Sequence, residues 1–156
     1  MLKKIRKRKI AAYSLFAIYL LYLFYFLFFA ELMGRADENR RYAYNLELFK
    51  EIKRFITYRH ILGFRAVFLN LAGNVIGFIP FGFFLPINSS RCRNFFFVVL
   101  LTFTTSLVIE GLQLIFKVGS FDVDDILLNT LGGLIGYLIY LGYAFLCKKR
   151  RNRKRK

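Results

Sequence analysis

Five acidic or amide side chains gather around one short connection between two apolar stretches of the chain. Glu110 lies within Asn94–Phe116, which carries no other charged residue, and the segment that follows adds Asp122, Asp124, Asp125 and Asn129. Carboxylate oxygens grouped in this way can bind a hard divalent cation. They can also form an acid–base pair, with the pKa of Glu110 raised by burial. We therefore look for a functional site here.

The elements that must position these side chains are long and apolar. The chain has 156 residues, of which 57% are hydrophobic. The apolar residues fall into four runs, Ile10–Met33, Ala66–Ile87, Asn94–Phe116 and Ile126–Cys147. Each run reaches the roughly 20 helical residues that cross a bilayer, and a helix satisfies its own backbone there. The sequence predicts an all-α, polytopic membrane protein with four transmembrane helices and a single domain over residues 1–156.

The net charge of +16 raises the question of nucleic-acid binding, but the distribution of the charge argues against it. Six of residues 1–9 and eight of residues 148–156 are Lys or Arg, and Arg91 and Arg93 occupy the other short basic loop. Cytoplasmic loops of membrane proteins carry such an excess of cations. We predict a multi-pass protein of the cell membrane with both termini cytoplasmic, whose basic tails contact anionic lipids rather than nucleic acid.

Polar and small residues follow one stripe on each of the last three predicted helices. These stripes are Asn70, Asn74, Gly77 and Phe81; Thr102, Ser106, Glu110 and Gln113; and Asp125, Asn129, Gly132 and Gly136. The pairs Gly73/Gly77 and Gly132/Gly136 are G-x-x-x-G motifs, which allow another helix, or a second copy of the chain, to approach closely. We also expect Pro80 to disturb its helix and Pro86 to end it.

Between the first two apolar runs, Leu46–Ile61 has the pattern of an amphipathic helix. Leu48, Ile52, Phe55 and Ile56 recur at helical spacing, and most charged residues lie away from them. A helix of this kind suits the headgroup layer of a membrane. A soluble helix that covers the end of the bundle is the alternative.

The predicted topology brings the polar residues to one side of the membrane. With the amino terminus inside, the acids and amides all fall in the outer halves of their helices. We therefore predict an outward-facing polar cavity whose binding residues are Asn70, Asn74, Glu110, Gln113, Asp122, Asp124, Asp125 and Asn129. A purely structural role is the alternative, since amides hydrogen-bond between helices and Asp122 has the position of an N-cap.

The order and spacing of these uncommon intramembrane residues resemble the VanZ-like family. The likeness rests on NLAGNVIGFIPFGFFLP from Asn70, EGLQ from Glu110 and FDVDDILLNTLGGLIGY from Phe121, and spans about Ala66–Tyr140. Asn45-Leu46 followed by Phe49 resembles the short motif that the family carries before its second span. Ser120 departs from the family, because many members carry an arginine there. The resemblance implies a Gram-positive envelope protein associated with tolerance to teicoplanin, a glycopeptide that acts outside the membrane.

Three functions remain open. A binding protein would hold an amphiphile, a lipid-linked cell-wall precursor or a glycopeptide through the acceptors and amides of the cavity. A membrane-embedded hydrolase or transferase would use Glu110 and Asp125 as catalytic candidates, although the sequence shows no histidine in the cluster and no H-E-x-x-H motif. A proton-coupled carrier would need the buried carboxylates as a relay. We expect membrane lipids as partners and no cofactor. The one cofactor that the carboxylates leave possible is a divalent cation.

Overall fold

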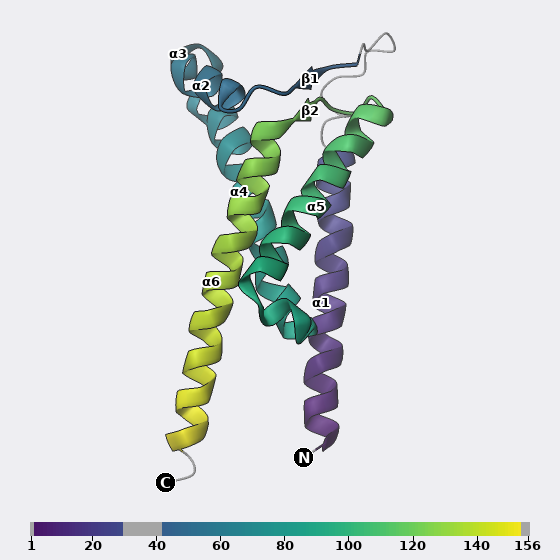
Figure 1. Cartoon of the computed structure of the whole chain (residues 1–156), viewed down its shortest axis with the longest axis vertical. Helices are drawn as coiled ribbons and strands as arrows, with labels where there is room; N and C mark the ends of the chain where they lie inside the picture. Colours follow the sequence, from purple (N-terminus) through teal and green to yellow (C-terminus); the bar gives the residue numbers. More distant parts are fainter. Residues whose placement is uncertain (1, 30–41, 154–156) are drawn as a thin grey trace.

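The computed structural model describes residues 2–29 and 42–153, and nearly all of them are helical (Figure 1). The elements are α1 (Leu2–Phe29), β1 (Tyr44–Asn45), α2 (Lys50–Thr57), α3 (Arg59–Leu62), α4 (Phe64–Asn88), the 3-10 helix η1 (Arg91–Arg93), α5 (Phe95–Ile115), β2 (Phe121–Asp122) and α6 (Val123–Arg153). Both termini lie at one end of the bundle. We call the opposite end, formed by β1, β2, α2 and α3, the distal end.

Four of these helices are long and apolar enough to cross a membrane: Ile10–Phe28, Val67–Asn88, Phe95–Ile115 and Val123–Arg153. The prediction of an all-helical, four-span membrane protein is therefore confirmed. The first span is predicted to reach Met33, and its residues 30–33 lie outside the described residues. Residues 1 and 154–156 of the basic tails lie outside them as well.

The fourth helix begins at Val123, directly after Asp122, which caps it, and so includes Asp124 and Asp125 ahead of the apolar run Ile126–Cys147. One predicted helix end was wrong. The second span does not end at Pro86; α4 contains both Pro80 and Pro86 and continues to Asn88. Prolines are tolerated in transmembrane helices because neighbouring groups can satisfy the backbone carbonyls that they release.

Helices α4 and α6 approach most closely, and glycines make this approach possible. A Cβ atom at Gly132 would overlap the carbonyl oxygen of Val75, and one at Gly136 that of Ile79. The prediction of close packing at Gly132/Gly136 is thus confirmed, and Gly82 of α4 meets the backbone of Gly133 in the same way. At Gly73/Gly77 no backbone lies as close among the described residues: a Cβ at Gly73 would meet nothing within 4 Å, and one at Gly77 would lie 3.8 Å from a side-chain carbon of Leu23 in α1. Whether a second copy of the chain uses this face stays a prediction.

Helix α1 packs on α4 and leaves most of its surface exposed. Leu23 is buried against Phe78 and Phe81 of α4. The hydroxyl of Tyr19 donates to the carbonyl of Gly77 at 2.6 Å, and that of Tyr13 to the carbonyl of Asn88 at 2.7 Å. These contacts hold α1 along the length of α4, while its remaining apolar side chains form a surface suited to lipid.

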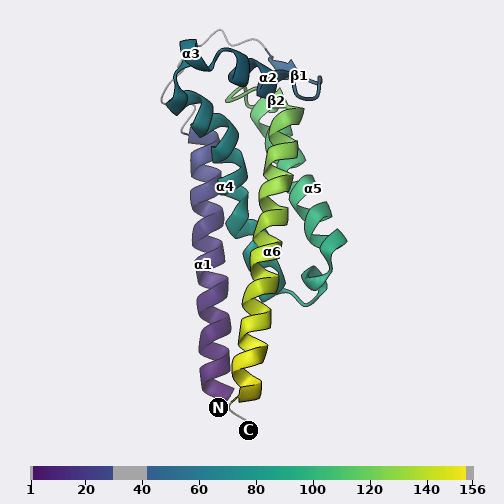
Figure 2. The ribbon, with the colours of Figure 1, turned by 90° about the vertical axis from the view of Figure 1, so that its left-hand side faces the viewer.

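The distal end is covered by α2 and α3, which lie across the ends of the spans (Figure 2). The predicted helix over Leu46–Ile61 is in fact two short helices, because the chain turns at Tyr58 before α3 begins. Beside them, β1 and β2 pair in parallel, with Tyr44 opposite Phe121 and Asn45 opposite Asp122. Whether α2 lies in the headgroup layer stays a prediction.

Candidate functional site

Asp122 joins the two short strands to the start of α6. Its Oδ1 accepts a hydrogen bond from the side-chain amide of Asn45 at 3.1 Å and another from the backbone N–H of Asp124 at 2.8 Å. The second bond is that of an N-cap residue, which satisfies one of the free N–H groups at a helix start. The predicted capping role of Asp122 is confirmed.

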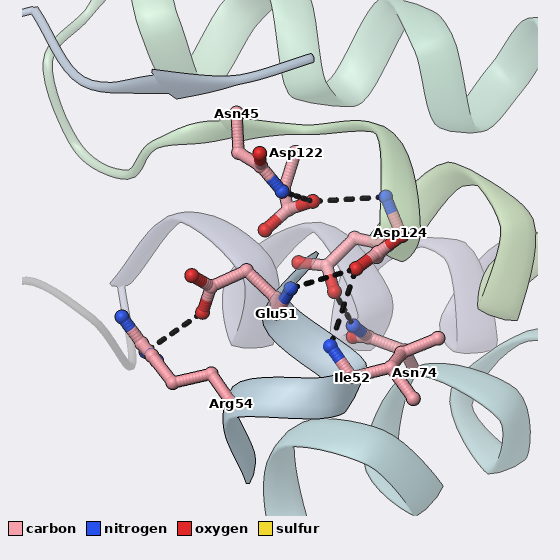
Figure 3. Close-up of polar contacts among 8 residues, drawn as sticks. Asn45, Glu51, Ile52, Arg54, Asn74, Asp122 and Asp124 are labelled. Carbon is pink, nitrogen blue, oxygen red and sulfur yellow. Dashed lines mark hydrogen bonds and ion pairs between the residues drawn. The ribbon is translucent and has the colours of Figure 1, made fainter. Parts of the chain in front are cut away.

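Asp124 caps a second helix, α2, which lies more than 70 residues earlier in the chain (Figure 3). Its Oδ2 accepts from the backbone N–H groups of Glu51 at 2.9 Å and Ile52 at 3.2 Å, and its Oδ1 accepts from that of Phe49. Phe49, the N-cap residue of α2, is in the left-handed conformation and provides no side-chain cap. Asp124 is 1% exposed, so this buried carboxylate supplies the cap that α2 lacks.

Glu110 connects α5 to Asp122, directly before α6. Its Oε2 accepts from the backbone N–H of Asp122 at 3.0 Å, and the side chain is only 3% exposed. Glu110, Asp122 and Asp124 therefore stand in a row of contacts that runs from α5 through β2 to the start of α2. Their hydrogen-bond donors are mainly backbone N–H groups.

Further polar contacts link the four long helices to one another. The side-chain amide of Asn74 donates to Oδ1 of Asp125 at 2.5 Å, between α4 and α6. That of Asn129 donates to the hydroxyl of Ser106 at 2.8 Å, between α6 and α5. That of Gln113 donates to the carbonyl of Leu27 at 2.9 Å, between α5 and α1. Asn70 lies on an exposed part of α4.

Two carboxyl groups at the distal end have a raised pKa. Burial raises the pKa of Asp122 above its usual range, opposed by the hydrogen bonds that it accepts from Asp124 and Asn45. Burial also raises the pKa of Glu51, opposed chiefly by Arg54, whose guanidinium lies 2.7 Å from the Glu51 carboxylate. In both groups the loss of water, which disfavours the charged form, exceeds the effect of the partners.

The predicted binding residues thus divide by their surroundings. Glu110, Asp122 and Asp124 contact the backbone of the distal end, while Asn74, Asp125, Gln113 and Asn129 link helices. Among the described residues, no group of three or more His, Cys, Asp or Glu side chains has the arrangement of a metal site. The role of these eight residues in binding or catalysis stays a prediction.

A cavity of about 280 Å³ opens between α1 and α4. Asn74 and Asn129 are the two predicted binding residues that line it. The wall that α1 contributes, which includes Tyr19 and Tyr22, was not predicted from the sequence. Tyr19 lies in the middle of an apolar span, and a buried tyrosine hydroxyl needs a hydrogen-bond partner. This is the sequence feature from which the contact of α1 could have been predicted.

Comparison with known proteins gives two matches. The model of the VanZ/LLP1 family matches residues 16–147. Protein VanZ of Enterococcus faecium is 40% identical over 76 residues, which are 47% of this chain and 45% of that protein. The aligned part therefore spans less than half the length of this relative. No solved structure matches the chain significantly.

Proposed function

Because the chain belongs to the VanZ/LLP1 family, we propose that it acts at the extracytoplasmic face in tolerance to glycopeptides such as teicoplanin, or more broadly in cell-envelope homeostasis. It does so by binding an amphiphilic or lipid-linked ligand, and the binding residues are those of the acidic and amide cluster. The observation that carries this proposal is that hydrogen bonds join Glu110, Asp122 and Asp124 at the distal end, opposite the start of α1 and the end of α6 (Figure 1).

The orientation that we propose for the protein rests on the distribution of its charges. The basic residues at the end of α6 project on the side of the termini, and η1 with Arg91 and Arg93 connects α4 to α5 on that same side. Cationic segments of a membrane protein remain in the cytoplasm. The distal end then faces outwards, where glycopeptides and wall precursors are accessible.

Binding is favoured over catalysis by the contacts of the carboxylates. Asp124 accepts three backbone N–H groups, and Glu110 accepts one. Carboxylates that are buried and held in this way have a fixed geometry, so they support the shape of the cluster rather than exchange a proton with a substrate. The alternative is a membrane-embedded hydrolase or transferase that uses Glu110 and Asp125. The experiment below changes these same two residues.

The test is teicoplanin susceptibility of a sensitive Gram-positive host that expresses the wild-type chain, Glu110→Gln, Asp125→Asn or an empty vector. We expect wild type to raise the minimal inhibitory concentration, and each variant to return it to the value of the empty vector. Each amide keeps an oxygen that can accept the bond from the Asp122 N–H or from Asn74, respectively, while the charge is removed. Membrane levels of each protein are measured in parallel.

Glu47→Gln is the matched control, because Glu47 is an exposed carboxylate at the same end of the molecule. It should protect as well as wild type does. Full protection by equally abundant Glu110→Gln and Asp125→Asn would contradict the assignment of these residues. A well-expressed wild-type chain that gives no protection would contradict drug tolerance itself in that host.

A further inference from the structure

A basic pocket of about 460 Å³ lies towards the end of the molecule that carries both termini, between the last turn of α4, η1 and the last turns of α6. Three cations line it, Arg93 of η1 and Lys148 and Arg151 of α6. All three residues are exposed, so a molecule in the pocket can reach them. Arg93 joins the other two only because η1 packs on α6.

The backbone of η1 is held against α6, which fixes the position of Arg93 independently of any ligand. The hydroxyl of Tyr137 donates to the carbonyl oxygen of Arg93 at 2.7 Å. The neighbouring Cys92 is buried in the same apolar cluster as Tyr137. On the other side, Asn94 caps α5 by accepting from the backbone N–H of Phe96 at 2.9 Å. A pocket that is already formed costs a ligand less free energy of ordering.

No acid in the described part of the chain is near enough to pair with these cations. Its acids lie before or in α2, in the second half of α5 and from Asp122 to Asp125, all towards the distal end. At 1.5 Å per residue, Asp125 stands roughly 35 Å from Lys148 along α6, and Glu110 roughly 22 Å from the first residue of α5. Three positive charges that share one pocket repel one another, so an anion between them is favoured.

The remaining wall of the pocket is apolar and lies on the side of the membrane spans. It includes Ile87 of α4 and Tyr140 and Ala144 of α6. Lys148 and Arg151 lie roughly 12 and 16 Å beyond Tyr140 along α6, towards the carboxyl terminus. Tyrosines are enriched at the level of the lipid headgroups. The pocket therefore offers cations on the side of the termini and apolar surface on the side of the bilayer, as a phospholipid requires.

We propose that this pocket binds the headgroup of one anionic glycerophospholipid, with its phosphodiester between Arg93, Lys148 and Arg151 and its acyl chains in the bilayer. Guanidinium groups bind phosphate oxygens through two parallel N–H···O bonds, and lysine adds a point charge. Basic pockets between transmembrane helices on the cytoplasmic side bind anionic headgroups in this way. The inference is independent of the proposed function, because the pocket lies at the opposite end of the molecule from the acidic cluster.

The size of the pocket and its apolar wall favour a lipid over a soluble phosphate. Ligand pockets span roughly 300–1,000 Å³, and about 460 Å³ accommodates a phosphate with its glycerol but not two acyl chains. A soluble phosphate would leave the apolar wall without a partner, whereas the glycerol and the first carbons of a lipid cover it.

A defined pocket differs from the diffuse attraction of the basic tails to anionic lipids that the sequence predicts. Diffuse attraction depends on the number of cations near the membrane surface. The pocket uses Arg93 but not Arg91 of the same 3-10 helix, and Arg151 but not the adjacent Arg150 of α6. Each pair carries the same charge and differs in position, so the two pairs separate a site from diffuse attraction.

The experiment measures the binding of single lipids to the purified full-length chain in detergent by native mass spectrometry, at physiological ionic strength. The probes are phosphatidylglycerol, phosphatidylcholine with the same acyl chains, and glycerophosphoglycerol, which is the headgroup of the first lipid without its chains. We expect the first phosphatidylglycerol to bind at least about tenfold more tightly than phosphatidylcholine, which corresponds to about 1.4 kcal/mol. Glycerophosphoglycerol should not bind detectably at the same concentration.

Arg93→Gln and Arg151→Gln should each weaken the binding of the first phosphatidylglycerol about fivefold, which corresponds to about 1 kcal/mol. Arg91→Gln and Arg150→Gln are the matched controls. They should weaken it by less than about twofold, because a charge that does not contact the phosphate is screened by water and salt. All four arginines are exposed, so no variant removes a buried side chain. Arg93→Lys keeps the charge and should bind more tightly than Arg93→Gln.

Equal losses within each pair of variants would overturn the proposal, because binding would then follow net charge alone. Equal affinity for the two lipids would overturn it as well. Glycerophosphoglycerol that binds as tightly as phosphatidylglycerol would replace the lipid by a soluble phosphodiester. None of these outcomes bears on teicoplanin susceptibility, so failure here leaves the proposed function standing, and failure of drug tolerance leaves the lipid site standing.

Discussion

Asp124→Asn is expected to release α2 from the distal end while the four spans remain folded. The two oxygens of Asp124 accept three backbone N–H groups at the start of α2. An amide has only one oxygen and presents its own N–H₂ group to the remaining donors. A hydrogen bond to a charged group contributes about 1.5–3 kcal/mol, so we expect local opening to become easier by about 3 kcal/mol.

The measurement is amide hydrogen exchange of the protein in nanodiscs, read by mass spectrometry. Exchange by local opening reports the free energy of that opening, and about 3 kcal/mol corresponds to roughly a hundredfold faster exchange over Phe49–Thr57. Peptides of α5 and of the middle of α6 should be unchanged. Glu47→Gln serves as the control, because its ion pair with Lys50 is exposed and such pairs contribute little. Unchanged exchange in Asp124→Asn would mean that contacts other than the cap hold α2.

The membrane-spanning part of the fold was predictable from composition and local pattern. An apolar run of sufficient length has few alternatives to a transmembrane helix, because every backbone group must be satisfied within the bilayer. Thr102, Ser106, Glu110 and Gln113 were predicted to share one face of their helix, and all four are buried. The polar stripe therefore predicted the inward face of α5 correctly.

The closest helix contact was only partly predictable. Gly73/Gly77 and Gly132/Gly136 have the same spacing, yet only the second pair lies against a neighbouring backbone. A G-x-x-x-G motif shows that a helix can be approached closely, but it does not specify which neighbour uses that face. The Gly73 face looks towards α1, which contacts it through side chains rather than backbone, as where Tyr19 donates to the carbonyl of Gly77.

The contacts of the acidic residues needed the tertiary structure. The capping position of Asp122 was readable because an N-cap is a local feature. Nothing local to Asp124 indicates that it caps α2, since its hydrogen-bond donors lie 72–75 residues earlier. The pairing of Asn45 with Asp122 is equally remote, because it depends on two strands of only two residues each.

Gly136→Ala is expected to destabilise the bundle as a whole, in contrast to the local effect at Asp124. The added Cβ would overlap the carbonyl oxygen of Ile79 and lie 2.8 Å from the backbone nitrogen of Phe83. Both are backbone atoms of α4, so neither can move aside without a shift of the helix. Overpacking of a close contact costs about 1–3 kcal/mol, occasionally more, and we expect the free energy of unfolding to fall by about 3 kcal/mol.

The loss is measured by unfolding in mixed micelles with increasing mole fraction of sodium dodecyl sulfate. Gly142→Ala is the matched control, since it lies on the same helix and its Cβ would meet nothing within 4 Å. It should leave the free energy of unfolding unchanged or raise it by up to about 1 kcal/mol, because alanine has the higher helix propensity. The same gain applies at Gly136, so the difference between the two variants isolates the α4–α6 contact. Equal stability of the two variants would contradict this packing, because it would mean that α4 and α6 do not approach closely enough for a methyl group at Gly136 to be felt.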